Sequence, residues 1–312
     1  MRLATLLLLV LAAVHHGRCA ALVKTSTNYP YSAWPSNIIK YRIGPGFVND
    51  ELQALKNAMQ QITEDSGRCI QFVQDTATTG PGSAPFVQIN HAFPPPGNNA
   101  ACWTYPGFHR GQLSSNIGQL AIAFGATGTT NADGACLGAG RERDAMAFLV
   151  NLLGQHNEWQ RSDRESVMTF GATDDAGRNN LVKTSLASKM FFGKGNQLSD
   201  PYGTNQGTFD PLSITMISSE RYSRDASNPV FRLANSQQVG QKAALSVADC
   251  QALMSMYGRY CPPTGSGSRP TCTTADPYAA GAVLPNNGAN TNTANQPGLP
   301  LQLDANGNPV LR

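Results

Sequence analysis

The sequence predicts an α+β domain organised around one twisted sheet. Short β-rich runs occupy the first half of residues 20–261, two apolar patterns of helical spacing interrupt them, and the alternation is too uneven for a regular βα repeat. The apolar content of this region is sufficient for one large domain or for two lobes of one. We therefore expect a single core built from a sheet with helices packed on it.

The first part of the domain alternates strands with one helix. Four runs have the β-branched and aromatic content of strands, at residues 37–43, 69–73, 86–89 and 119–124. Residues 49–64 lie between the first two runs and carry apolar side chains at helical spacing, namely Leu52, Leu55, Ala58, Met59 and Ile62. Asn49 or Asp50 is the expected N-cap of this helix.

Two further helices are expected in the second part. Residues 144–153 form an apolar helix that ends at Gly154, where we expect the left-handed backbone of a helix C′ position. Near the end of the domain, Ser246 and Asp249 have the spacing of a capping box before a terminal helix. The chain between these two helices is predicted to be largely irregular.

Both ends of the chain differ from the domain in composition. Residues 1–19 have one basic residue before an apolar run and then a small-residue approach to Ala20, which is the layout of a secretory signal peptide cleaved after Cys19 or one residue to either side. The apolar run is shorter than the about 20 residues that span a bilayer, so no membrane insertion is expected. Residues 262–312 are rich in Pro, Gly, Asn and Thr and are predicted to be a disordered tail.

Charge and cysteine content narrow the partners and the compartment. The net charge of +3 falls close to neutral when Arg2 and Arg18 leave with the signal peptide, so there is no basic surface for nucleic acid. Removal of Cys19 leaves six of the seven cysteines, and an even number in an exported chain predicts disulfides. Their spacing alone does not choose the pairs. The expected partner is an extracellular protein or peptide.

Several segments in one order resemble the astacin family of zinc metallopeptidases, which are metzincins. The resemblance covers about residues 20–261, and the segments that carry it are Trp34-Pro35 followed by IIKYRI at 38–43, RCIQFV at 68–73, CWTYPG at 102–107, RSDRE at 161–165, FDPLSI at 209–214, and VGQK at 239–242 with Leu245, Ser246, Asp249, Met256 and Tyr257.

The resemblance implies a particular fold and set of disulfides. The fold would be a two-lobed domain with a cleft between the lobes, a twisted mixed sheet and two long helices in the upper lobe, and an irregular lower lobe with a C-terminal helix. The family pattern implies the bridges Cys69–Cys261 and Cys102–Cys136, which leaves Cys250 and Cys272 as a further pair.

The family's catalytic pattern, H-E-x-x-H-x-x-G-x-x-H-E, is not retained. Two histidines one helical turn apart and a third after the glycine bind zinc, and the glutamate is the general base. With Gly154 as the anchor, the ligand positions here are Ala147, Asn151 and Asn157, and the base position is Phe148. A methyl group and neutral carboxamides are poor zinc ligands, and a phenyl ring moves no proton. We therefore expect no zinc and no other cofactor.

The Met-turn segment, Glu158 and His156 complete the comparison with the family's catalytic region. The Met-turn, residues 213–217, has Thr215 at the methionine position and Ile217 at the tyrosine position, after Ser213; a one-residue slip would restore Met216 but not the tyrosine. Glu158 corresponds to the glutamate that pairs with the processed N-terminal amine in the family, the alternative being an exposed residue. His156 lies one position before the third ligand and lacks helical partners for a rewired site.

These features predict a secreted astacin-like protein without peptidase activity. Such a protein could bind a pseudo-substrate, a partner or an inhibitor in the former substrate cleft, or it could be an extracellular structural protein whose cleft does nothing. The alternative is a zinc-dependent metalloendopeptidase with a degenerate or rewired site. A serine hydrolase is disfavoured because no G-x-S-x-G motif is present.

Overall fold

The fold is described from a computed structural model of the chain. It describes the following residues: 20–22, 31–75, 85–91, 104, 106–109, 119–123, 137, 141–170, 204–206, 208–216, 225, 229, 231–233, 239, 243–261 and 272. The predicted signal peptide and nearly all of the predicted tail lie outside these residues, so the boundaries at residues 19 and 261 stay predictions.

The main sheet has four strands in the order β4-β3-β5-β7, with bounds Gln71–Gln74, Ile38–Ile43, Phe86–Asn90 and Gln119–Ala123. All three strand pairs in it are parallel, with Ile38 opposite Gln71, Lys40 opposite Phe86 and Phe86 opposite Gln119. The mixed sheet expected from the resemblance is therefore not found among the described strands. The parallel pairing of β3 with β4 follows from the helix that crosses between them.

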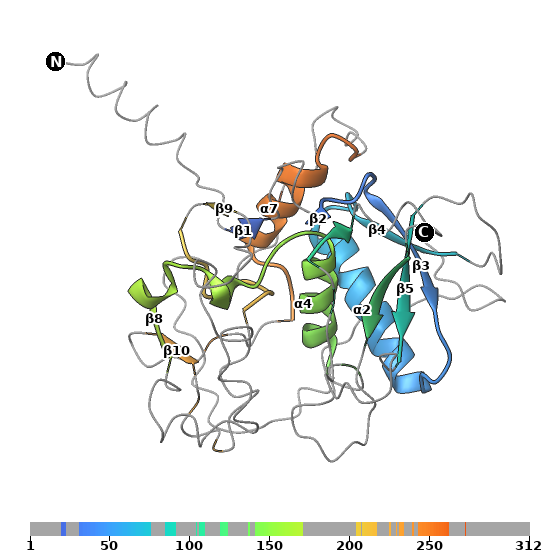
Figure 1. The fold of residues 1–312 in the computed structure, drawn as a ribbon, viewed down its shortest axis with the longest axis horizontal. Helices are drawn as coiled ribbons and strands as arrows, with labels where there is room; N and C mark the ends of the chain where they lie inside the picture. Colours follow the sequence, from blue (N-terminus) through green and yellow to red (C-terminus); the bar gives the residue numbers. More distant parts are fainter. Residues whose placement is uncertain are drawn as a thin grey trace.

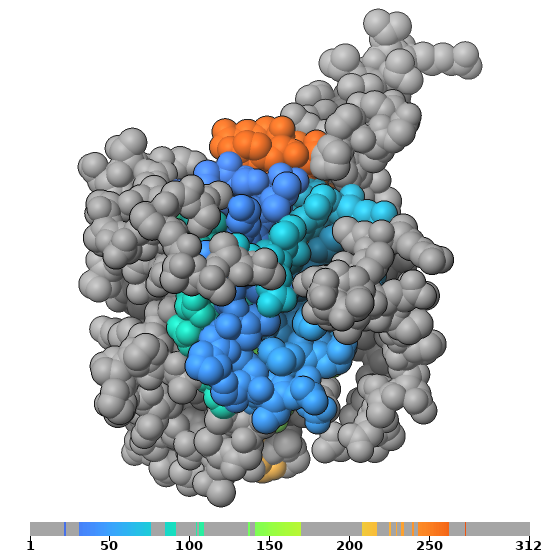
Figure 2. Space-filling view, turned by 90° about the vertical axis from the view of Figure 1, so that its right-hand side faces the viewer, coloured from blue at the N-terminus to red at the C-terminus, as the bar shows by residue number. Residues whose placement is uncertain are grey.

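Two helices form the layer beside this sheet. Helix α2 (Asn49–Asp65) and helix α4 (Glu142–Leu152) lie side by side against it (Figure 1). The apolar face of α2 is buried as its pattern predicts, with Leu55, Ala58 and Ile62 fully buried in the core that also holds Leu149 and Leu153. Figure 2 shows the molecule from the right-hand side of Figure 1, where the N-terminal half of the chain forms most of the coloured surface.

The helix ends differ slightly from the prediction. The N-cap of α2 is Val48, one residue before the expected Asn49, because the Glu51 carboxylate accepts a hydrogen bond from the Val48 N–H at 3.0 Å and supplies the cap itself. Helix α4 begins at Glu142, two residues earlier than predicted. Its first turn contains acidic residues, whose negative charge interacts favourably with the positive end of the helix dipole.

The remaining described elements are short. Three two-stranded antiparallel ladders pair β1 with β9, β8 with β10 and β2 with β6. Their bounds are Ala20–Leu22, Thr204–Gln206, Met168–Phe170, Phe231–Leu233, Tyr31–Ser32 and Phe108–His109. Two 3₁₀ turns, η2 (Glu158–Gln160) and η3 (Arg164–Ser166), follow α4. Between α4 and residue 243, the described residues form only these short ladders and turns, and much of this part of the chain lies outside the described residues, so its irregular character stays a prediction.

Helix α7 (Val247–Tyr257) closes the domain. The predicted capping box is present: the Ser246 hydroxyl accepts a hydrogen bond from the Asp249 N–H at 2.9 Å, and the Asp249 carboxylate accepts one from the Ser246 N–H at 3.0 Å. The helix packs near β1 and above α4 in Figure 1. Among the described residues, no helix has both the length and the apolar character needed to cross a membrane.

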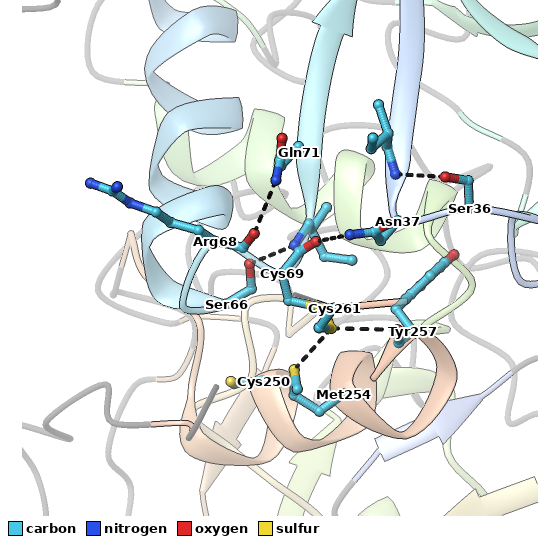
Figure 3. The surroundings of a disulfide bond; sticks show 12 residues. Ser36, Asn37, Ser66, Arg68, Cys69, Gln71, Cys250, Met254, Tyr257 and Cys261 are labelled. Atoms are coloured by element: carbon cyan, nitrogen blue, oxygen red, sulfur yellow. Dashed lines mark hydrogen bonds between the residues drawn. A yellow bond between two sulfur atoms is a disulfide. The ribbon is translucent and has the colours of Figure 1, made fainter. Parts of the chain in front are cut away.

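Two disulfides link helix α7 and the residues just after it to other parts of the chain. They join Cys69 to Cys261 and Cys250 to Cys272, which are two of the pairs considered from the resemblance; Cys102 and Cys136 lie outside the described residues. The first bridge connects the end of α7 to the start of β4, where Asn37 also donates a hydrogen bond to the Cys69 carbonyl at 2.7 Å (Figure 3).

The two bridges should differ in their effect on stability. Cys69–Cys261 spans 192 residues and Cys250–Cys272 spans 22, and a longer closed loop removes more entropy from the unfolded chain. We expect the Cys69→Ala/Cys261→Ala variant to lose about 2–5 kcal/mol of unfolding free energy, and more than the Cys250→Ala/Cys272→Ala control. Urea unfolding of both variants checks this, and a larger loss in the short-loop variant would contradict it.

Candidate functional site

The region that corresponds to the family's catalytic pattern is organised by the end of helix α4. Leu152 and Leu153 are fully buried, so their carbonyl groups need donors from the protein. The Trp34 indole donates to the Leu152 carbonyl at 2.9 Å, and the Tyr257 hydroxyl donates to the Leu153 carbonyl at 2.6 Å. The next residue, Gly154, has a φ of 106°, the left-handed backbone that the sequence predicts.

The positions that correspond to zinc ligands carry out other tasks. Asn151 is buried, and its side-chain amide donates to the Gln155 carbonyl at 2.8 Å. Asn157 is half-buried, and its amide donates to the Gln160 side-chain oxygen at 2.8 Å. Ala147 is half-buried on α4, and Phe148, at the base position, packs against the hydrophobic core. Two of these side chains are thus engaged in hydrogen bonds within their own segment.

This arrangement does not fit a catalytic zinc ion. Such an ion needs about three nitrogen or oxygen ligands of sufficient basicity together with a water molecule. Ala147 offers no donor atom, and the Asn151 amide is directed at a backbone carbonyl. In the part of the chain that the structure describes, no group of three or more His, Cys, Asp or Glu side chains is placed to hold a metal.

The Met-turn lies beside this region and is tied into it by hydrogen bonds. Ser213, Thr215 and Met216 are buried, and Ile217 lies outside the described residues. The Thr215 hydroxyl accepts a hydrogen bond from the Glu158 N–H at 3.2 Å and lies 2.8 Å from the Ser213 hydroxyl. The threonine at the methionine position therefore connects the Met-turn to the chain that follows Gly154.

A buried polar network continues from the Met-turn to helix α7. The Asp249 carboxylate accepts hydrogen bonds from the Ser213 hydroxyl and the Ile214 N–H, both at 2.6 Å, and from the Gln155 amide. Sequence analysis identified Asp249 only as a capping residue and did not identify Gln155. No local pattern signals these contacts, because they join residues far apart in the chain.

Glu158 is fully buried rather than exposed. One carboxylate oxygen accepts a hydrogen bond from the Asp210 N–H at 2.8 Å and lies 3.2 Å from the Arg161 guanidinium. The other oxygen has no hydrogen-bond partner among the described residues. Burial raises the pKa of Glu158 to about 8, outweighing the attraction of Arg161. Within the part of the chain that the structure describes, the buried side-chain oxygen of Gln155 also has no hydrogen-bond partner.

The residues that would follow signal cleavage lie in the same area. Strand β1 runs antiparallel to β9, and Leu22 forms an antiparallel bridge with Gln155. Because this bridge is antiparallel, the chain that runs backward from Leu22 to Ala20 points the same way as the chain that runs forward from Gln155 to Glu158. Residues 1–19 are still attached in this structure, so Ala20 has no free amine to pair with Glu158. The pairing of Glu158 with a processed N-terminal amine therefore stays a prediction.

His156 is buried, with 3% of its surface exposed, between the Gly154 turn and Asn157. It directly precedes the third ligand position, which is why it is weighed as a ligand of a rewired metal site. The described residues around it supply no partner set for a metal.

Comparisons with known proteins support the fold. No family model and no curated protein matches the sequence. Among solved structures, high choriolytic enzyme 1, a hatching-enzyme zinc protease from the medaka fish Oryzias latipes, aligns with 77% of this chain and 100% of its own, at 18% identity and a TM-score of 0.51. Two structures of myroilysin align with 76% and 78% of this chain and 98% and 92% of their own, at 17% and 13% identity and TM-scores of 0.40 and 0.41.

At such low identity, the likeness to the hatching enzyme shows the fold and not the activity. Among the described residues, the helix pair beside the sheet and the C-terminal helix correspond to the arrangement that the sequence resemblance implies. The chain therefore has the fold of the astacin-like metalloproteases.

The buried Glu158 carboxyl predicts a pH dependence for the chain that retains residues before Ala20. Its pKa is about 8 in the folded state and about 4.5 in the unfolded state. Between pH 4.5 and 8 the folded state therefore binds a proton that the unfolded state has lost. The free energy of unfolding should fall as the pH rises through this range. The contribution is at most about 1.4 kcal/mol per pH unit.

Urea unfolding at several pH values measures this slope. Glu158→Gln should reduce it, whereas Glu165→Gln, which changes an exposed carboxyl in the same segment, should leave it unchanged. Equal slopes for the wild type and Glu158→Gln would contradict the predicted role of the buried carboxyl.

Proposed function

We propose that this protein is a secreted member of the astacin family that has lost peptidase activity and binds an extracellular protein or peptide through the former substrate cleft. One observation carries the loss of activity: the ligand positions Ala147, Asn151 and Asn157 supply no histidine, and the Asn151 amide is committed to the Gln155 carbonyl. The base position, Phe148, holds a side chain that transfers no proton.

Secretion is supported by two independent features. The N-terminal segment has the composition of a signal peptide, and two disulfides join described residues. Disulfides of this kind persist in oxidising compartments, so they agree with an extracellular location.

The binding role is supported by retention of the fold without its catalytic residues. Phe148 and Ala147 provide apolar surface on the helix where the enzymes have a metal and a charged base. Such a surface favours a peptide held by apolar contacts, either as a pseudo-substrate or as part of an inhibitor. The competing proposal is an extracellular structural protein with no ligand for this surface.

Metal content distinguishes the inactive protein from a zinc metalloendopeptidase. We expect purified wild-type protein to contain no stoichiometric zinc and to show no change in melting temperature with a chelator, because no ligand set fixes the ion. The Ala147→His/Asn151→His/Asn157→His variant should gain zinc binding, since the helix and the Gly154 turn still present these positions at the family spacing.

Elemental analysis and calorimetry with and without chelator give these two readouts. Stoichiometric zinc in the wild type, together with chelator-sensitive peptide cleavage, would overturn the proposal. Failure of the histidine variant alone would show only that the site cannot be rebuilt by three substitutions.

Binding by the former cleft is tested with extended peptides and with protein inhibitors of active astacins, measured by calorimetry. We expect at least one probe to bind the wild type, and Phe148→Asp to weaken it at least tenfold, about 1.4 kcal/mol, by placing a charge in the apolar surface. Val73→Asp, on an exposed strand position, is the matched control. Absence of binding by every probe would favour the structural alternative.

We further propose that the processed N-terminal amine pairs with Glu158. One oxygen of Glu158 and one of Gln155 lack a hydrogen-bond partner among the described residues, and β1 approaches this segment at Leu22; both observations support the pairing. An ammonium group beside Glu158 would keep the carboxylate charged in the folded state. The decline in stability between pH 4.5 and 8 should then disappear in the processed chain and return when its amine is acetylated; an unchanged slope on processing would refute the pairing.

A further inference from the structure

Arg143 lies on the side of helix α4 that carries the former ligand positions. Residues 143, 147 and 151 are spaced by four, so they share one face of the helix. The Arg143 side chain is largely buried, with 13% of its surface exposed. The guanidinium is thus mostly buried, and its residue lies one helical turn before Ala147.

The contacts of Arg143 cross from the helix to the Met-turn. One terminal nitrogen donates to the Ile214 carbonyl at 3.3 Å and also to the Met216 carbonyl. The other terminal nitrogen lies 3.6 Å from the Asp144 carboxylate, which offsets part of its charge. A planar guanidinium presents several donors in a fixed geometry, so it can bind two carbonyl groups of one turn at once.

We propose that Arg143 is an internal clamp that holds the Met-turn against α4 in the absence of a metal. Two further hydrogen bonds connect α4, the chain after Gly154 and the Met-turn. The Asn151 amide of α4 donates to the Gln155 carbonyl, and the Glu158 N–H donates to the Thr215 hydroxyl of the Met-turn. Arg143 is the member of this set that joins the helix itself to the Met-turn. The inference rests on the proposed metal-free state of the site.

The chemistry of the clamp makes it independent of pH and chelators. A guanidinium stays protonated throughout the physiological range, and backbone carbonyls do not titrate. A metal-based connection would instead weaken as its ligands become protonated. The hydrogen bonds from Arg143 to the Met-turn should therefore be equally strong from about pH 5 to pH 8.

Hydrogen exchange of the full processed chain tests the clamp. The N–H groups of Ile214, Thr215 and Met216 are all hydrogen-bonded, so their protection reports the stability of the turn. In Arg143→Ala their protection should fall at least about tenfold, which is the effect of losing hydrogen bonds from a charged donor, while helix α2 keeps its protection.

Arg141→Ala is the matched control. Arg141 lies at the start of the same helix, and its side chain is 42% exposed and 3.7 Å from Asp144. This variant should retain wild-type protection in the Met-turn. Wild-type protection of the turn in Arg143→Ala, or an equal loss in both variants, would overturn the proposal.

If Arg143→Ala does not fold, Arg143→Lys gives the same comparison, since lysine keeps the charge but loses the two-carbonyl geometry. It should lose protection at the Met-turn relative to the wild type, and wild-type protection would overturn the clamp. Zinc found in the wild-type protein would contradict the proposed function, whereas unchanged exchange in these variants would contradict only the clamp.

Discussion

The carbonyl groups at the end of helix α4 impose the constraint on which this structure depends. They are buried beside a turn that leaves the helix at Gly154, and an unsatisfied buried carbonyl costs about 1–3 kcal/mol. Trp34 and Tyr257 supply the donors, and the Tyr257 hydroxyl also accepts a hydrogen bond from the Trp34 N–H at 3.0 Å. Because these two residues are 223 positions apart, one small cluster fixes the N-terminal segment, the central helix and α7 together.

This cluster uses no residue of the former catalytic pattern, which explains how the fold and the chemistry can be separated. Side chains at the ligand positions can change as long as the helix end, the glycine turn and the Met-turn remain connected. Asn151 and Thr215 contribute hydrogen bonds to those connections, and Asp249 joins the Met-turn to α7. The pseudoenzyme that we propose therefore needs no metal to keep its shape, because short polar contacts connect the segments around the former site.

Local patterns predicted the features that depend on local physics. The apolar spacing of α2, the capping box of Ser246 and Asp249, and the left-handed Gly154 follow from rules that act within a few residues. The roles of Gln155 and Arg143 could not be predicted, since their partners come from the Met-turn and α7, which are remote in sequence. The N-cap of α2 was displaced to Val48 because the buried Glu51 supplies the cap from inside the helix.

The central claim is that hydrogen bonds within the protein occupy the place of a catalytic metal centre. An experimental structure of the processed chain, crystallised in the presence of zinc, tests it most directly. The account predicts that the Asn151 amide still donates to the Gln155 carbonyl and that no metal is bound among Ala147, Asn151 and Asn157. Zinc coordinated by Asn151, Asn157 or His156, with the Asn151 amide turned away from that carbonyl, would contradict it.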